Sequence, residues 1–347
     1  MLLGDNNNLI MDFEVRQFSE DDVDDVSDLS RAVYGDASAE AFEKRWRWEF
    51  KENPFAGKKE PLLVALSGSE LIGTLFVTPM KLKVDDSVSE AGWVNHFMVH
   101  PDYRNRGVGR ALLLELKGRW DTVFMFPASA LSCNLALKAG WFDVGLVHPR
   151  RLPLRRSFLG LFSIPPNSGK KFGSNAGISA NTDVSEIQSF DKEFDTLWSR
   201  VSKHLRISAV RGSAYLNWRY VSCPVKSYRI LKAEIGGELK GFMVVSVEKK
   251  AGRIVDFLVG QENDSVFGAL LNEAINFFVG QKLEFVESIS VGGNTANLLG
   301  RRGFELKKGG LFFIGRTSAK MPGQSMLADL GGWHLTFGDS NADYLVF

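Results

Sequence analysis

Strand-like and helix-like hydrophobic patterns follow one another along the first half of the chain. Apolar runs typical of strands lie at 13–18, 61–68, 70–82, 92–99, 122–126 and 141–147. Helical patterns lie at 39–50, 108–119 and 129–140, and acidic first-turn residues predict a further helix after Ser19. A helix pair, an antiparallel meander and a β-α-β-α-β segment predict an α/β (α+β) domain with a mostly antiparallel twisted sheet flanked by helices.

The second half repeats three local patterns of the first half in the same order. WRWEFKENP, which ends at Pro54, is matched by LNWRYVSCP, which ends at Pro224. GWVNHFMV at 92–99 is matched by GRIVDFLV at 252–259, and KAGWF at 138–142 is matched by RRGFE at 301–305. Such repetition predicts two tandem copies of one fold.

A segment rich in Gly, Ser, Pro and Asn separates the two copies and is typical of a linker. We therefore predict a first domain at 11–156, a linker at 157–178 and a second domain at 179–347. The length of 347 residues fits two domains of roughly 100 to 200 residues each.

Composition and charge limit the classes of molecule that the protein is expected to bind and the compartment in which it is expected to work. The 42 basic and 41 acidic residues nearly cancel, which leaves no overall field for nucleic acid or an anionic membrane. Two cysteines outside any metal-ligand spacing fit a reducing compartment, and we expect no metal. The opening MLLGDNNNLIMDFEV lacks a signal-peptide pattern, so we expect a cytoplasmic protein. The oligomeric state stays open, with a homodimer among the options.

The run RNRGVG at 104–109 joins an apolar strand to a helix. Backbone N–H groups at a helix N-terminus lack partners and attract anions. We expect Gly107 and Gly109 to let a pyrophosphate approach the backbone, and Arg104 and Arg106 to add charge. A dinucleotide fingerprint or a Walker A loop would need other spacings.

The run VHPDYRNRGVGRALL resembles the signature of the GNAT superfamily of acyl-CoA-dependent acetyltransferases, (R/Q)-x-x-G-x-(G/A), and the resemblance covers about residues 12–156. In that family the amides of the turn bind the CoA pyrophosphate, and the splayed strand before the turn holds the pantetheine arm. The resemblance implies acetyl-CoA as cosubstrate. It implies donor-binding roles for Phe97, Met98, Val99, Arg104, Asn105, Arg106, Gly107, Val108, Gly109 and Arg110.

The second copy lacks this turn. After Val259 the sequence reads GQENDSVFGALL, which has no arginine and adds Glu262 and Asp264, both unfavourable to a pyrophosphate. We expect one CoA site, in the first domain. The second domain is interpreted as a degenerate GNAT-like copy that walls the acceptor pocket.

Acyl transfer to an amine requires a proton acceptor and a proton for the leaving thiolate. His96 is the candidate base, with a structural strand histidine as the alternative, and strand alternation places Asn95 on the opposite face. Many GNAT enzymes place an acidic tyrosine where this chain has Ala136. Tyr103, the second domain or solvent is then the source of the proton.

Aromatic residues of the second helix fall where this fold commonly lines the acceptor site. We expect Trp46 and Asn95 to contact the acceptor, whereas Trp48 is interpreted as core because Trp218 repeats it. The tail GGWHLTFGDSNADYLVF is interpreted as an edge strand and loop, with a terminal carboxylate in the active site as the alternative.

The sequence thus predicts an acyl-CoA-dependent N-acyltransferase. It would transfer acetyl to a primary amine of a small molecule, such as an amino sugar or an aminoglycoside-like amine, by direct attack. Two alternatives stay open: an acyl-CoA-binding regulatory module without turnover, and a protein or peptide amine acetyltransferase.

Overall fold

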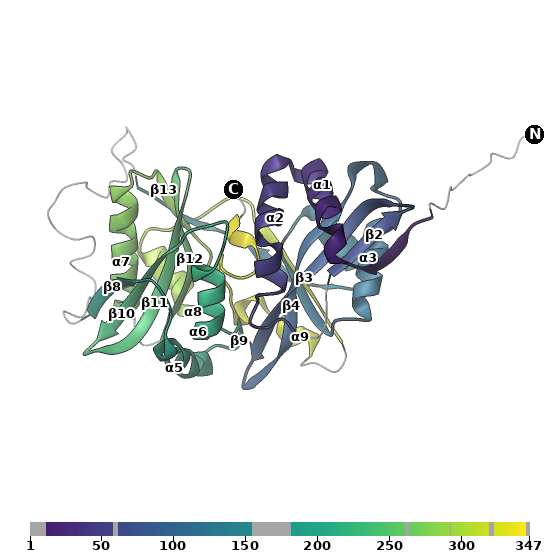
Figure 1. Cartoon of the computed structure of the whole chain (residues 1–347). Helices are drawn as coiled ribbons and strands as arrows, with labels where there is room; N and C mark the ends of the chain where they lie inside the picture. Colours follow the sequence, from purple (N-terminus) through teal and green to yellow (C-terminus); the bar gives the residue numbers. More distant parts are fainter. Residues whose placement is uncertain are drawn as a thin grey trace, which may run out of the picture.

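The protein is built from two twisted sheets that lie side by side, each flanked by helices (Figure 1). The computed structural model describes residues 12–57, 62–154, 182–260, 264–291, 293–318 and 323–344. In these ranges both sheets are mixed and mostly antiparallel, which confirms the predicted fold class. The predicted linker at 157–178 lies outside the described residues.

The first sheet has the strand order β1-β2-β3-β4-β5-β15-β6. Its strands are β1 (Glu14–Gln17), β2 (Leu62–Ser67), β3 (Glu70–Val84), β4 (Ser87–Val99), β5 (Thr122–Ala128), β6 (Phe142–Val147) and β15 (Leu311–Thr317). Short β9 (Ile207–Ala209) pairs with the far end of β3, and β16 (Trp333–His334) pairs with β9. The contact between β4 and β5 is parallel.

Helices cover both faces of the first sheet. They are α1 (Val23–Tyr34) and α2 (Asp36–Phe50) on one face, and α3 (Val108–Lys117) and α4 (Ala130–Lys138) on the other. Alternate residues of β2 explain the two layers, because Val64 packs with α1 and α2 whereas Leu63 packs with α3 and α4. The Ser19 side chain caps the first segment through a capping box, as the acidic run after it predicted.

The second sheet has the order β14-β7-β13-β12-β11-β10-β8. Its strands are β7 (Arg150–Pro153), β8 (Thr182–Ile187), β10 (Arg229–Ile235), β11 (Glu238–Glu248), β12 (Ala251–Val259), β13 (Phe285–Ser288) and β14 (Glu305–Leu306). Helices α7 (Asp264–Gly280) and α8 (Gly293–Arg301) accompany α5 (Lys192–Val201) and the short α6 (Ser213–Leu216), whereas α9 (Gln324–Leu327) contacts β15 of the first sheet. A π-helical turn, Asn217–Val221, continues α6.

Each sheet contains an inner strand from the other half of the sequence. β7 precedes the predicted linker but pairs with β13 and β14 in the second sheet. β15, from near the end of the chain, lies between β5 and β6 in the first sheet. Sheet membership therefore does not follow the division at 157–178. Short strands carry no signal for this exchange, because pairing between distant strands is set by tertiary packing.

One hydrophobic cluster contains residues of both halves of the chain. Trp48 of α2 stacks on Trp218 with ring centroids 4.7 Å apart. Each indole Nε1 donates to the other residue's backbone oxygen over 2.8 Å. This reciprocal contact confirms that Trp48 belongs to the core and joins the halves through matching residues.

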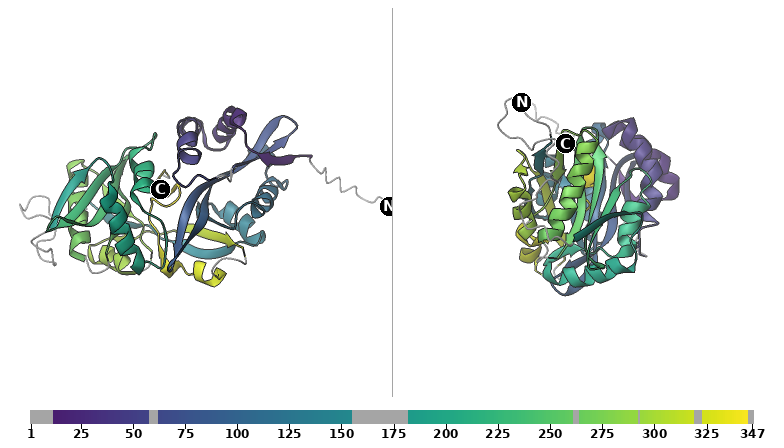
Figure 2. Two further views of the ribbon diagram at one scale, coloured as in Figure 1. Left: turned by 60° about the horizontal axis from the view of Figure 1, so that its bottom comes forward. Right: turned by 90° about the vertical axis from the view of Figure 1, so that its left-hand side faces the viewer.

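The segment after β16 threads between the halves. Its residues from Leu335 to Asp343 are mostly buried, and the last described turn is Ala342–Tyr344. Both Figure 1 and the left view of Figure 2 place this last described turn between the two sheets. The predicted edge strand is β16, and the terminal carboxylate of Phe347 lies outside the described residues.

Candidate active site

The turn between β4 and α3 ends at the backbone amides that begin the helix. A 3-10 turn, Pro101–Tyr103, leads to Gly107, whose φ of +87° lies in the left-handed region that glycine favours. Gly107 has no side chain with which to cap α3, so the first amides of α3 face outward. They suit an anion, because the positive end of the helix dipole adds to them.

β4 separates from β5 just before this turn. The ladder joins Gly92 to Val123 and Trp93 to Phe124. In the described part of the chain, residues 94–99 of β4 have no ladder partner in β5, which pairs with β15 on its other side. One edge of β4 therefore offers free backbone groups to a ligand, as the resemblance implied.

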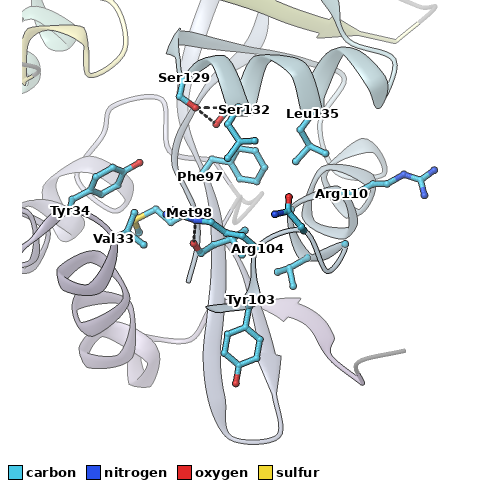
Figure 3. A pocket seen from close by; sticks show the side chains of 16 residues that line it. Val33, Tyr34, Phe97, Met98, Tyr103, Arg104, Arg110, Ser129, Ser132 and Leu135 are labelled. Atoms are coloured by element: carbon cyan, nitrogen blue, oxygen red, sulfur yellow. Dashed lines mark hydrogen bonds between the residues drawn. The ribbon is translucent and has the colours of Figure 1, made fainter. Parts of the chain in front are cut away.

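A cavity of about 340 Å³ lies along this free edge and reaches the turn (Figure 3). We call it the donor cavity. Its lining consists of Val33, Tyr34, Phe97, Met98, Val99, Tyr103, Arg104, Asn105, Gly107, Val108, Gly109, Arg110, Ser129, Leu131, Ser132 and Leu135. Nine of the ten residues predicted to bind the donor are among them, and Arg106 is the exception.

The two glycines of the turn have different roles. A Cβ on Gly107 would meet nothing within 4 Å, so a ligand can approach this residue. A Cβ on Gly109 would lie 2.9 Å from Leu135 Cδ2 and 3.4 Å from Phe97 Cζ. Gly109 lines the donor cavity as well, and its small size also lets α3 pack against α4 and β4.

The three arginines near the turn also differ. Arg104 lines the donor cavity and its Nε donates to the Val99 oxygen over 3.2 Å. Arg106 lies over the ring of Tyr103, 5.6 Å from the centroid. Arg110 extends away from the cavity in Figure 3. Arg104 is therefore the best placed of the three to meet an anion in the cavity.

The Tyr103 hydroxyl forms a hydrogen bond with a residue outside the lining of the donor cavity. It donates to Glu70 Oε2 over 2.6 Å, and this bond raises the pKa of Tyr103. Its ring points away from the cavity in Figure 3. Ala136, at the position where the family carries a tyrosine, is fully buried in the core against α3.

Tyr34 and two serines bring hydroxyl groups into the donor cavity. Tyr34 ends α1, is 67% exposed and points into the cavity in Figure 3. Ser129 caps α4 by accepting from the Ser132 amide over 3.0 Å, which confirms the capping interpretation. Sequence reasoning missed Tyr34, since its position before Gly35 marks only the end of a helix.

A β-bulge in β4 changes the directions of the side chains around His96, the predicted base. The register with β3 shifts between Thr74 and Phe76, and His96 has a φ of +46°. The Asn95 and His96 side chains both contact Glu49 of α2, at 3.3 and 3.2 Å. The expectation that they lie on opposite faces is wrong, because the extra residue breaks the alternation.

Glu49 is the centre of a buried polar cluster that the sequence did not reveal. Its Oε1 accepts from Thr78 Oγ1 at 2.6 Å, Asn95 Nδ2 at 3.3 Å and Asn341 Nδ2 at 3.2 Å. Its Oε2 lies 3.2 Å from His96 Nε2 and 3.4 Å from Arg45 Nε. An acid within an amphipathic helix usually faces solvent, so only its place between Trp48 and Phe50 hinted at burial.

The cluster can hold a proton on His96 or release it. Nε2 of His96 lies 3.0 Å from Arg45 Nη2, so it can accept from Arg45 when neutral and donate to Glu49 when protonated. Burial lowers the pKa of His96. Burial alone would raise the pKa of Glu49, but His96 and Arg45 outweigh it and hold that pKa well below its usual range. At neutral pH the cluster pairs a carboxylate with a neutral imidazole.

A second, smaller cavity lies where the halves meet. We call it the interface cavity; it has a volume of about 10 Å³. Its lining consists of Trp48, Glu49, Thr78, Pro79, Met80, Trp93, Tyr215, Trp218, Arg219, Ser340 and Asn341. This volume holds about one water molecule.

Trp46 is placed in the core of the first half. It is 5% exposed and packs edge-on against Phe18, with ring centroids 6.0 Å apart. It lies among residues of α1, α2 and β2, and neither cavity includes it in its described lining. Of the two predicted acceptor contacts, Asn95 is thus the one joined to the Glu49 cluster.

The described residues contain no group of three or more His, Cys, Asp or Glu arranged to hold a metal ion. None of the helices in these ranges has the length and apolar character needed to cross a membrane.

Known proteins resemble both the sequence and the fold. Residues 14–130 match the acetyltransferase (GNAT) domain family. The fold is similar to a GCN5-related N-acetyltransferase from Kribbella flavida, with TM-score 0.62, 16% identity, and 90% of this chain and 72% of that chain covered. One from Anabaena variabilis gives TM-score 0.61 and 14% identity over 88% and 72% of the two chains.

An acyl-CoA complex is also among the similar structures. Saccharomyces cerevisiae N-myristoyltransferase with bound myristoyl-CoA gives TM-score 0.56 and 12% identity, with 88% of this chain and 82% of that chain covered. No curated protein matches the sequence. Residues 14–130 are therefore similar to the acetyltransferase (GNAT) domain family, and the domain match and these structures together support an acyltransferase.

Proposed function

We propose that the protein transfers an acetyl group from acetyl-CoA to a primary amine of a small molecule, such as an amino sugar or an aminoglycoside-like amine. One observation carries the proposal. The donor cavity follows the free edge of β4 to the N-terminus of α3, so one channel offers backbone groups, apolar walls and an anion site in sequence.

The residues of the donor cavity fit the parts of CoA. Phe97, Met98 and Leu135 supply apolar walls for the pantetheine arm. The open space at Gly107 and the amides of α3 suit the pyrophosphate, with Arg104 beside them. When bound, acetyl-CoA supplies the activated acyl group.

His96 is the proposed base. Its imidazole is neutral at neutral pH because burial lowers its pKa, so it can accept the proton of the attacking amine. Arg45 and Glu49 orient the ring in either protonation state. Among the hydroxyls of the donor cavity, that of Tyr34 is proposed as the proton donor to the thiolate, because the Tyr103 hydroxyl is bonded to Glu70.

We further propose that the chain is a tandem of two GNAT-like copies with one donor site. The reciprocal bonds of Trp48 and Trp218 support it. So do the glycines after α4 and α8, Gly140 at φ +88° and Gly303 at φ +85°. Asp264 opens α7 where the first copy has its glycine turn, which favours a donor site in the first copy only.

The rival proposal is an acyl-CoA-binding regulatory module without turnover. The small volume of the interface cavity favours it, because an acceptor needs more room than one water molecule. An acetyltransferase that acts on proteins or peptides would need an open acceptor groove instead.

Release of CoA from acetyl-CoA, measured across amino sugars, aminoglycosides, polyamines and peptides, tests the function. The matched variants are Gly107→Asp and Gly107→Asn, which share size and tolerate a left-handed backbone. We expect Gly107→Asp to weaken acetyl-CoA binding at least about 10-fold more than Gly107→Asn, because only the aspartate repels the pyrophosphate.

Gly118→Asp is the control, since Gly118 lies exposed at the other end of α3 and a Cβ there meets only Glu115 O, 3.8 Å away. Equal binding of acetyl-CoA by the Asp and Asn variants at position 107 would exclude the proposed anion site. Saturable binding without release for any amine would favour the regulatory module.

A further inference from the structure

We propose that the interface cavity is the acceptor subsite, that Oε1 of Glu49 binds the ammonium group of the acceptor, and that Asn341 occupies the place of this group in the present structure. The acceptor class is a compact primary amine that also bears hydroxyl groups. The inference rests on the proposed function and names the substrate class of its acceptor side.

The two oxygens of Glu49 face different partners. Oε2 lies against His96 and Arg45, whereas the hydrogen bonds to Oε1 come from the neutral donors Thr78, Asn95 and Asn341. Glu49 is 1% exposed and lines the interface cavity. A charged ammonium donor bonds to a carboxylate about twice as strongly as a neutral amide does, so it can displace the amide.

Asn341 is the donor that an acceptor can displace. Its Nδ2 lies 3.2 Å from Oε1, farther than Thr78 Oγ1 at 2.6 Å. It belongs to the C-terminal segment, whereas Thr78 and Asn95 lie in paired strands. Ser340 beside it has a φ of +58° and donates to Asn95 Oδ1 over 2.9 Å. Asn341 lines the interface cavity and belongs to no strand, so displacement of its side chain would enlarge the cavity without breaking either sheet.

The walls of the cavity suit a cation with hydroxyl groups. Trp48, Trp93, Tyr215 and Trp218 contribute aromatic surface, which attracts an ammonium group. Trp93 is 2% exposed, and its indole Nε1 has no hydrogen-bond partner among the residues that the structure describes. A buried donor without a partner costs free energy that a hydroxyl oxygen of a ligand can recover.

The subsite is joined to the donor cavity through β4. Trp93 lines the interface cavity, Asn95 contacts Glu49, and Phe97 lines the donor cavity, so alternate residues of one strand lead from acceptor to donor. His96 lies between them at the bulge. An amine released from Glu49 Oε1 therefore has the proposed base as its neighbour.

Tryptophan fluorescence tests the subsite without acyl transfer, because three tryptophans line the cavity. The full chain is titrated with glucosamine and, as a matched neutral probe, glucose, in the absence of acetyl-CoA. We expect saturable binding of glucosamine, with glucose at least about 10-fold weaker. Equal binding of the two sugars, or no saturable change with glucosamine, overturns the proposal.

Variants locate the binding atom. Glu49→Gln should weaken glucosamine at least about 10-fold, whereas Glu52→Gln, which alters an exposed carboxylate after the same helix, should leave it unchanged. Asn341→Ala should strengthen glucosamine binding several-fold by removing the competing amide. It tests the same atom if Glu49→Gln fails to fold. Unchanged affinity in Asn341→Ala, or in a folded Glu49→Gln, contradicts the proposal.

A parallel titration with acetyl-CoA separates the two levels of inference. We expect Asn341→Ala to bind acetyl-CoA like the wild type, because Asn341 lies outside the described lining of the donor cavity. If the wild type binds acetyl-CoA but not glucosamine, the subsite is wrong and the donor site stands. If it binds glucosamine but not acetyl-CoA, the proposed function is wrong and the amine site stands.

Discussion

β4 and β12 each contain a bulge against the strand that precedes it, and the two bulges have different neighbours. The register shifts between Asn95 and Met98 in β4, beside His96, and between Ile254 and Asp256 in β12. The first bulge adjoins the donor cavity through Phe97. At the second, the Gly338 amide donates to the Val255 oxygen over 2.7 Å and the Tyr220 hydroxyl donates to Asp256 over 2.8 Å.

The polar groups at the two bulges are satisfied in opposite ways. Arg211 is 1% exposed and bonds to both Asp256 and Asp339, so the charges at the second bulge are paired within the protein. His96 at the first bulge is neutral at neutral pH and can still take up a proton. The comparison teaches that the strand geometry alone does not make a site; the packing against the bulge decides whether a ligand can use it.

The largest effect is expected at the first bulge. His96→Gln should lower turnover by about 100-fold or more, since a positioned base contributes typically about 100- to 10,000-fold. In the wild type, kcat/KM should fall as the pH drops through the pKa of His96, which lies below its ordinary value of 6.5. Steady-state rates from pH 4 to 8 check both. Wild-type turnover in His96→Gln would remove this residue from the mechanism.

The matching change at the second bulge should affect stability. Arg211→Ala leaves the carboxylates of Asp256 and Asp339 buried without their cation, which costs about 3 to 5 kcal/mol of unfolding free energy. Urea unfolding measures it. Arg206→Ala is the control, because its ion pair with Asp329 is exposed and should cost less than about 1 kcal/mol. A small loss in Arg211→Ala would show that the second bulge tolerates unpaired charge.

His334, which contacts the residue after the second bulge, makes the free energy of unfolding depend on pH. Its Nε2 lies 3.1 Å from the Phe257 oxygen, and burial and the Arg211 charge lower its pKa to about 4. A lowered histidine pKa stabilises the fold above the unfolded value of 6.5, and this stability is lost as the pH falls from 6.5 to about 4. The loss amounts to about 3 kcal/mol.

His334→Gln keeps a side-chain donor but does not titrate, so its unfolding free energy should fall less between pH 6.5 and 4 than that of the wild type. Urea unfolding at several pH values provides the comparison. Parallel pH profiles for the two proteins would rule out His334 as the source.

The smallest effects separate the two glycines of the donor turn. Gly107→Ala should cost about 1 to 2 kcal/mol through its left-handed backbone. Gly109→Ala should cost about 1 kcal/mol through contact with Leu135, whose flexible end can shift. Leu135→Ala shortens the neighbouring side chain, so it should reduce the loss of unfolding free energy caused by Gly109→Ala but not the loss caused by Gly107→Ala. A double-mutant cycle measured by thermal unfolding tests this difference. Equal rescue of both would contradict the separate roles.

Local signals predicted much of the fold and part of the site. The hydrophobic periods gave the strands from β1 to β6 and the helices between them, and the run at 104–109 marked the donor turn. The residues missed are those whose role depends on distant contacts. Glu49 accepts a hydrogen bond from Asn341, which lies far from it in the sequence. The bulge at His96 breaks the alternation of side chains along β4, on which the predicted orientation of Asn95 depended.

The exchange of β7 and β15 makes each half a necessary part of the other. A chain divided between residues 154 and 182 would give one piece whose sheet lacks the strand between β5 and β6, and another that lacks the strand between β13 and β14. Neither piece would therefore contain a complete sheet of its own. Two such pieces made in the same cell would instead have to find each other and restore both sheets before any donor site could form.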